Sequence, residues 1–225
     1  MAFCFNESPI TDVYFSLRSG YEALATEMVA YANESMPIRD GKRRYVLFEG
    51  QAALMDAAAL LGYEKTDGFT QLGYDLSKPL DHPLPDGFRF ERPGALDPRK
   101  ISLCCWKGFN HEAEEGSWNG DYEGCLGTEA APHATPQYPV AILNDRDEYV
   151  CYAGMWWIPQ NKLAYMEPLC TVPEYRLHGL ASAALSELSR RMIPLGATHM
   201  TGGANPFYAR LGFQPALRWT FWEKR

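Results

Sequence analysis

The chain of 225 residues is long enough for one large domain or two small ones, and its hydrophobic fraction of 46% is ample for a packed core. Its net charge of −7 at pH 7, without any run of lysine and arginine, argues against a nucleic-acid-binding surface. The first residues lack the basic-then-apolar order of a signal peptide, and no apolar stretch could span a bilayer, so we expect a cytoplasmic protein with no membrane partner.

The first third of the chain predicts a small α/β segment. Residues 15–33 carry apolar side chains at helical spacing, and residues 51–61 form an alanine-rich pattern that also predicts a helix. Residues 43–49 and 69–75 predict strands. We therefore expect a segment over residues 1–80, followed by a linker rich in proline and glycine at residues 81–87.

The main domain is expected over residues 88–225. It opens with a strand at residues 88–91, and Asp97-Pro98 then predicts the start of a helix. Residues 110–139 are long for a connector, and residues 112–122 within it carry four acidic and two aromatic side chains. These side chains are suited to a cationic amine, but a solvated acidic loop is the simpler interpretation; they are Glu112, Glu114, Glu115, Trp118, Asp121 and Tyr122.

The second half of this domain predicts a strand meander followed by a helix. The strands are expected at residues 140–143, 149–158 and 163–171, and Pro168 predicts a bulge or a point where two strands part. Gly179 opens a helix with an apolar stripe that ends near residue 194. Residues 199–202 predict a strand, residues 205–211 a short helix, and residues 213–222 the last strand.

The turn at residues 176–181 is the chemical centre of this pattern. A helix N-terminus offers unpaired backbone N–H groups and the positive end of the helix dipole, and Gly179 lets an anion approach them. The turn therefore suits a phosphate or pyrophosphate. On the glycine alone, an ordinary strand-to-helix connection remains the simpler interpretation.

Three pieces of this region resemble the GNAT superfamily of N-acetyltransferases. Arg176-x-x-Gly179-x-Ala181 is similar to the family's Arg/Gln-x-x-Gly-x-Gly/Ala motif, and the strand and turn before it also resemble the family. A second motif follows in family order, with Asn205, Tyr208 and a Leu-Gly-Phe run. The resemblance implies an α/β fold with a mixed, mostly antiparallel, twisted sheet and helices on both sides.

The resemblance also implies the cofactor and the residues that hold it. Acetyl-CoA is the expected acetyl donor, with no metal, and the cysteines and histidines show no zinc-site spacing. Backbone N–H groups at the strand end would hold the pantetheine arm, and those of the turn and the helix start would bind the pyrophosphate. The residues expected at the cofactor are Leu169, Cys170, Thr171, Arg176, Leu177, His178, Gly179, Leu180, Ala181, Ser182 and Asn205. Arg176 would either close the turn or contact a phosphate, and Asn205 fits a cofactor contact and the cap of a helix that begins at Pro206 equally well.

Two residues are expected to be catalytic. Tyr208, implied by the resemblance, would give its proton to the departing thiolate, although it also fits a packed aromatic residue. Glu167 would take a proton from the amine through a water, and a sheet-face glutamate paired with a cation is a comparable interpretation. Cys170 is less attractive as a nucleophile, because no histidine nearby in sequence is evidently positioned to activate it.

The function we expect is transfer of an acetyl group from acetyl-CoA to a primary amine by direct attack in a ternary complex. The acceptor is a small-molecule or peptide amine, and the protein is a monomer or homodimer. A non-catalytic acyl-CoA-binding or sensor protein is the alternative. A doubly wound nucleotide-binding enzyme is disfavoured, because the glycine turn follows a meander of strands.

The first 80 residues admit two interpretations. Leu61-Gly62-Tyr63 follows a helix and precedes a strand, as Leu211-Gly212-Phe213 does near the C-terminus. Residues 1–80 are therefore either a reduced GNAT-like half without a pyrophosphate turn or an unrelated α/β extension.

Overall fold

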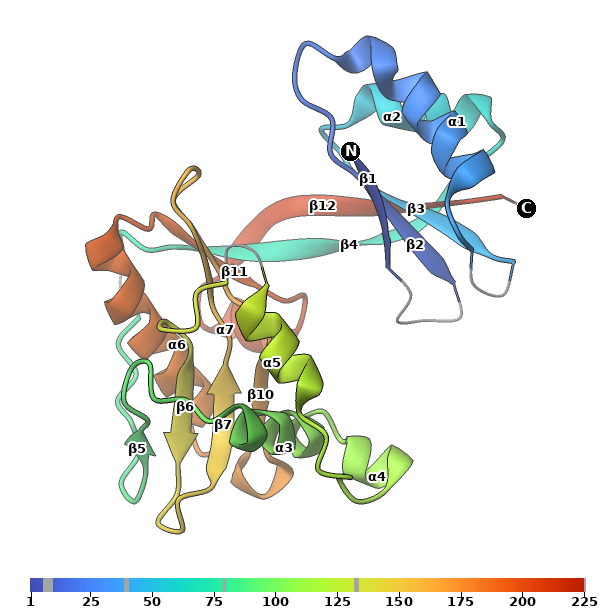
Figure 1. Ribbon diagram of the computed structural model, residues 1–225. Coiled ribbons are helices and arrows are strands. Elements are labelled where there is room, and N and C mark those ends of the chain that lie inside the picture. The colour runs from blue at the N-terminus through green and yellow to red at the C-terminus, as the bar shows by residue number, and fades with distance from the viewer. Residues whose placement is uncertain (6–9, 39–40, 79, 132–133, 225) are drawn as a thin grey trace. The chain divides into compact units, whose positions relative to one another are not determined.

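The computed structural model describes residues 1–225 except 6–9, 39–40, 79, 132–133 and 225 (Figure 1). Pro79, in the proline-rich stretch before the predicted linker, therefore lies outside the described residues. The chain forms two compact units, one of residues 1–72 with 215–225 and one of residues 73–214. Among the described residues, every helix is too short or too polar to cross a bilayer.

The first unit combines a sheet with two helices. Its strands follow the order β1-β2-β3-β12-β4, and alternate residues of β2 are buried, as expected for a strand with one covered face. The core contains side chains from β2, β3 and both helices, among them Val13, Val29, Tyr45 and Leu54. The elements are β1 (Ala2–Phe5), β2 (Thr11–Phe15), α1 (Ala25–Ser35), β3 (Arg43–Phe48), α2 (Ala52–Leu60), β4 (Glu64–Asp75) and β12 (Gln214–Glu223).

The second unit contains the predicted meander and its helices. One sheet has the order β10-β7-β6-β5, and the strands β11, β9 and β8 follow β4 in the other. Every residue of β7 is buried, and both α3 and α6 pack against this strand. The elements are β5 (Arg89–Phe90), α3 (Pro98–Gly108), α4 (His111–Glu115), α5 (Glu123–Ala130), β6 (Val140–Leu143), β7 (Tyr149–Ala153), β8 (Trp156–Ile158), β9 (Leu163–Tyr165), β10 (Leu169–Thr171), α6 (Leu180–Met192), β11 (His199–Gly202) and α7 (Pro206–Arg210).

The predicted α/β class with a mostly antiparallel sheet is confirmed. Among the pairs with a described register, only β2–β3 and β9–β11 run parallel. The start of α3 also follows the prediction, since the Asp97 carboxylate accepts hydrogen bonds from the backbone N–H groups of Arg99 and Lys100.

Three element predictions were wrong. The single strand expected over residues 149–158 is two strands in different sheets, β7 and β8, which are separated by Gly154 and Met155. The helix expected over residues 15–33 starts only at Glu22 with a 3₁₀ turn, because Thr11–Phe15 alternates and pairs as β2. The connector expected over residues 110–139 contains the short helices α4 and α5. The sequence analysis missed these two helices because they are short and rich in acidic residues, without a clear apolar stripe.

The chain changes sheets after β9, at the position that Pro168 predicted. Strand β9 pairs with β8 and β11, whereas β10 pairs with β7 in the other sheet. Between them, the Gly154 N–H donates to the Pro168 carbonyl at 2.7 Å, and the Glu167 N–H donates to the Gly154 carbonyl at 3.2 Å. The parting leaves one edge of β10 without a neighbouring strand in its sheet, among the residues that the structure describes.

The two Leu-Gly-aromatic runs end their helices in the same way. Gly62 and Gly212 have φ of +81° and +94°, conformations that glycine adopts at no steric cost. The following N–H groups of Tyr63 and Phe213 reach back to the carbonyls of Ala58 and Tyr208, at 3.0 and 3.1 Å. This is the hydrogen bond of a Schellman motif, and a long strand follows each time.

Candidate active site

A cavity of about 500 Å³ lies where β10, the turn at residues 176–179, α6 and α7 meet. Its walls include ten of the eleven residues predicted for the cofactor, together with Tyr208. His178 is the exception: its side chain is exposed and does not line the cavity. Tertiary structure thus brings together residues that are up to 39 positions apart in the prediction, from Leu169 to Tyr208.

The start of α6 presents backbone N–H groups to this cavity. Gly179 is the N-cap with φ of +82°, and among the described residues no side chain caps this end. The first hydrogen bond of the helix runs from the Ala183 N–H to the Gly179 carbonyl at 3.0 Å. The N–H groups of Leu180, Ala181 and Ser182 come before it and have no carbonyl of a preceding helical turn to bind. Leu177 also has a left-handed φ of +64°, a strained conformation for a bulky residue.

The edge of β10 contributes further N–H groups. The Pro168 carbonyl accepts a hydrogen bond from the Gly154 N–H, and the Val172 N–H donates one to the Val150 carbonyl. Both residues therefore direct their backbone groups toward β7. Because backbone groups alternate between the two edges of an antiparallel strand, those of Leu169 and Thr171 point away from β7 and toward the unpaired edge. The same alternation directs the N–H of Cys170 toward β7, so the expectation that it holds the pantetheine arm is not supported by the geometry.

The Arg176 side chain fixes the start of the turn. Its guanidinium donates to the carbonyl oxygens of Thr171 at 3.1 Å and Gly108 at 2.8 Å, and to the Asn110 side chain at 2.9 Å. These three acceptors fix the end of α3 against the end of β10. Of the two roles expected for Arg176, closing the turn is the one that these contacts perform.

Tyr208 is held on α7 with its ring in the core. It is 8% exposed and packs edge-on against Phe213, with ring centroids 5.3 Å apart. Burial raises the pKa of Tyr208 to about 12, and the charge of the Glu167 carboxylate acts in the same direction. The phenol is therefore fully protonated at neutral pH and available as a hydrogen-bond donor.

Asn205 caps α7 and lies in the wall of the cavity. Its side chain accepts a hydrogen bond from the Phe207 N–H at 2.9 Å as the N-cap of α7, and it also lines the cavity. The cavity further includes Gly108, Tyr175, Phe207 and Arg210, which the sequence analysis missed. The i, i+3 spacing of Phe207 and Arg210 places them on one face of a helix and was the available signal for this pair.

Cys170 sits in a cluster of buried thiols. Its Sγ lies 4.0 Å from that of Cys104 and 3.9 Å from that of Cys105. The hydrogen-bonding Cys104 thiol and burial raise the pKa of Cys170 well above its usual value, so the reactive thiolate is scarce. Among the described residues, no group of side chains is arranged to hold a metal ion.

Glu167 lies on a separate, smaller cavity of about 50 Å³. The residue is exposed, and Pro168, which follows it, also lines the small cavity. The next residue, Leu169, lines the large cavity. Thr128 of α5 and Trp156 of β8 are also in the wall of the small cavity. The acidic residues at 112–121 line neither of these two cavities.

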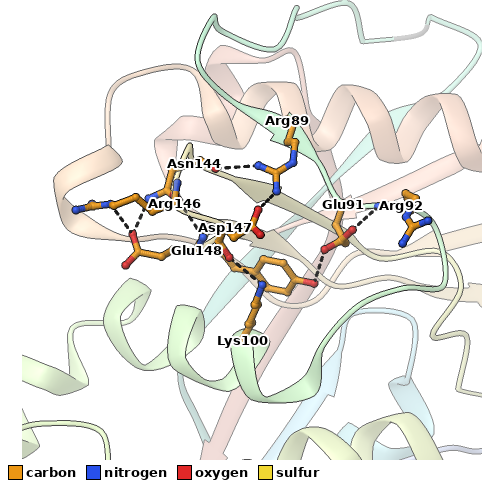
Figure 2. Close-up of polar contacts among 9 residues, drawn as sticks. Arg89, Glu91, Arg92, Lys100, Asn144, Arg146, Asp147 and Glu148 are labelled. Atoms are coloured by element: carbon orange, nitrogen blue, oxygen red, sulfur yellow. Dashed lines mark hydrogen bonds and ion pairs between the residues drawn. The ribbon is translucent and has the colours of Figure 1, made fainter.

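A third hollow, of about 560 Å³, lies beside α3 and the turn between β6 and β7. Figure 2 shows contacts among charged groups near it: Arg89 pairs with Asp147, and Lys100 donates to the Asp147 carbonyl at 2.9 Å. Arg146 pairs with Glu148 at 3.3 Å. The hollow is lined by Tyr175 and by none of the predicted site residues.

Comparisons with known proteins agree with the resemblance in the sequence. The model of the acetyltransferase (GNAT) family matches residues 100–213. No curated protein sequence matches the chain.

The solved structures that resemble the chain are distant in sequence. A GCN5-related N-acetyltransferase from Sphaerobacter thermophilus has a TM-score of 0.69 at 17% identity, over 99% of this chain and 75% of that one. A tandem GNAT protein from the clavulanic acid biosynthesis pathway has a TM-score of 0.64 at 18% identity, over 96% and 75%. L-PGS from Bacillus licheniformis has a TM-score of 0.61 at 10% identity, over 99% and 79%. At these identities the likeness shows the fold alone.

Proposed function

The chain belongs to the GNAT acetyltransferase family, and from this premise we propose that it transfers the acetyl group of acetyl-CoA to a primary amine within a ternary complex. The observation that supports the proposal best is the cavity of about 500 Å³, which combines a helix N-terminus, an open strand edge and a protonated phenol. A thioester cofactor with a pyrophosphate needs these three features.

The cofactor would bind from the turn inward. The N–H groups of Leu180, Ala181 and Ser182, together with the helix dipole, would hold the pyrophosphate. Arg210 supplies a positive charge at the same cavity. The outward N–H groups of Leu169 and Thr171 would pair with the pantetheine arm as an added strand does.

The reaction would proceed by direct attack. Glu167 would take a proton from the ammonium, directly or through a water, and the neutral nitrogen would then form a bond to the thioester carbon. An N–H of β10 would stabilise the tetrahedral oxyanion, an interaction typically contributing about 3 kcal/mol. On collapse, the C–S bond breaks, the sulfur leaves with its electron pair, and Tyr208 would protonate it while the nitrogen loses its second proton to solvent water, from which the Tyr208 phenolate is reprotonated.

The high pKa of Tyr208 defines its role. A phenol with a pKa of about 12 is a weaker acid than a free phenol, so full proton transfer ahead of bond cleavage is uphill. The proton would therefore move as the C–S bond breaks and negative charge gathers on sulfur. Its burial has the benefit that the phenol is never ionised at neutral pH.

We also propose that residues 1–80 are a reduced GNAT-like half. The order β3–α2–β4 repeats β11–α7–β12, with the same Schellman end after each helix. The tandem GNAT protein, which resembles 96% of the length of this chain, supports the idea. A crystal structure in which residues 1–80 do not superpose on the C-terminal half would contradict it.

A cytoplasmic location is proposed on the basis of the six cysteines, which are all free thiols in the structure. Fluorescence microscopy of a tagged protein tests this directly, and secretion or a membrane signal would refute it.

The first experiment measures acetyl-CoA binding by titration calorimetry for the wild type and for Gly179→Glu. The added carboxylate would fill the turn and repel the pyrophosphate, and we expect a loss of at least about 100-fold in affinity. Gly196→Glu is the matched control, because Gly196 also has a φ near +90° and has open space around it, outside the cavity. Equal losses in both variants would show strain rather than a blocked site.

Thiol release in the presence of amines then distinguishes an enzyme from a non-catalytic acyl-CoA-binding protein. A folded wild-type protein that binds no acetyl-CoA would refute both functions.

A further inference from the structure

We propose that the acceptor is a monoamine whose nitrogen is carried by an unbranched, apolar chain, with no carboxylate beside the nitrogen. This rests on the proposed acetyl transfer and names its substrate class. The observations that carry it concern the small cavity at Glu167.

The position of this cavity suits an acceptor. Glu167 and Pro168 line it, and the next residue, Leu169, lines the large cavity proposed for the thioester. An amine held at Glu167 would thus approach the strand parting from one side while the thioester approaches from the other. Leu169 is the first residue of β10, which is the edge strand of its sheet among the described residues.

The size of the cavity limits what can enter. Its volume of about 50 Å³ is one tenth of the volume of about 500 Å³ of the cavity at Tyr208. A space of this size favours an ammonium group on an unbranched carbon, because a second substituent on that carbon would crowd the walls. We therefore expect branched amines to be disfavoured.

The chemistry of the walls limits the substrate further. Leu96, Pro136, Pro139, Met155 and Trp156 give the cavity an apolar lining. Among the described residues, Glu167 is the charged side chain in the wall, and no lysine or arginine lines it. A carboxylate next to the nitrogen would therefore be repelled without a cation in the wall to offset it, and a second ammonium group would lose its water without gaining a partner.

Hydrogen bonds hold these walls in place. The Thr135 hydroxyl donates to the Met155 carbonyl at 2.8 Å and accepts from the Trp157 N–H at 3.1 Å. Arg191 of α6 donates to the Pro139 carbonyl at 2.7 Å. These hydrogen bonds join residues 135–139 to both β8 and α6. The packing of the second unit therefore keeps the cavity small.

The test compares four amines that share a four-carbon skeleton. They are butylamine, the branched 2-aminobutane, 2-aminobutanoate and 1,4-diaminobutane, and the readout is kcat/KM from thiol release. We expect butylamine to exceed 2-aminobutane at least about 10-fold and 2-aminobutanoate at least about 100-fold, with the diamine below butylamine. A preference for the amino acid, the branched amine or the diamine would overturn the proposal.

Two variants connect the selectivity to the cavity. Trp156→Ala should enlarge it and make the branched amine a better substrate relative to butylamine, an effect that mere loss of stability does not produce. Glu167→Gln should lower kcat/KM for butylamine and narrow its advantage over 2-aminobutanoate, while Glu34→Gln on α1 of the other unit leaves both unchanged. An unchanged ratio in both site variants would contradict the assignment.

Acetyl-CoA binding, measured in parallel by calorimetry, separates the two levels of the argument. Binding without transfer to any of the four amines would overturn the substrate class alone. Absence of binding would refute the proposed function and this inference with it.

Discussion

The guanidinium of Arg176 donates a hydrogen bond of 2.8 Å to the carbonyl oxygen of Gly108, the last residue of α3. The same side chain holds the end of β10 through the Thr171 carbonyl. The turn proposed for the pyrophosphate is therefore positioned by the side chain of its own first residue.

Replacing Arg176 should loosen the turn and weaken acetyl-CoA binding. We expect Arg176→Ala to raise Kd about 10-fold, since hydrogen bonds from a charged donor contribute roughly 1.5–3 kcal/mol. Arg176→Lys should restore little, because an ammonium group cannot match the planar fork that reaches all three acceptors. Arg190→Ala, which removes an exposed ion pair on α6, is the charge-matched control for the calorimetry. Full rescue by lysine would indicate a simple charge effect.

Tyr208→Phe tests the proposed acid. The ring keeps its packing against Phe213, so acetyl-CoA binding should stay within about twofold, while kcat falls about 100-fold because general acid catalysis is lost. Steady-state kinetics with butylamine measures both quantities. If kcat is unchanged, the thiolate must be protonated by another group or by solvent.

The same variant has an alkaline stability signature. Burial raises the folded-state pKa of Tyr208 to about 12, above the usual value of about 10. The folded state then binds the proton more tightly, so this contribution to stability is complete below pH 10 and is lost as pH rises from 10 to 12. Denaturant unfolding of the wild type should weaken over this range by on the order of 3 kcal/mol more than that of Tyr208→Phe. Parallel curves for the two proteins would mean that the phenol is not buried.

Direct attack predicts that no acetyl-enzyme forms. The pKa of Cys170 is raised by the neighbouring Cys104 thiol and by burial, so few molecules carry the thiolate that a covalent mechanism needs. Intact mass spectrometry after incubation with acetyl-CoA alone should show the unmodified protein, and initial rates should give intersecting double-reciprocal lines. A mass increase of one acetyl group on Cys170, with ping-pong kinetics, would falsify this mechanism.

Gly154→Ala should disturb Glu167 without touching the cofactor site. A Cβ at Gly154 would lie 2.1 Å from the Glu167 carbonyl oxygen, so the backbone at the strand parting has to shift. We expect KM for butylamine to rise about 10-fold while Kd for acetyl-CoA changes little. Gly127→Ala on α5, where nothing lies within 4 Å of the added carbon, is the control. A rise in Kd as large as the rise in KM would show that β10 moves as a whole.

Local sequence patterns were enough to predict the strand meander, the capped starts of α3 and α7, and the glycine turn before α6, because periodicity, proline and cap residues act over a few neighbouring positions. They also predicted the strand parting at Pro168, since proline cannot donate to a ladder.

The contacts between these elements follow from the tertiary structure and not from local sequence patterns. The brace from Arg176 to Gly108, the direction of the Cys170 N–H and the contribution of Arg210 depend on pairings between segments far apart in the chain. The division between a large cavity at Tyr208 and a small one at Glu167 has the same origin, because cavity size depends on how side chains from several elements pack, which no local pattern records.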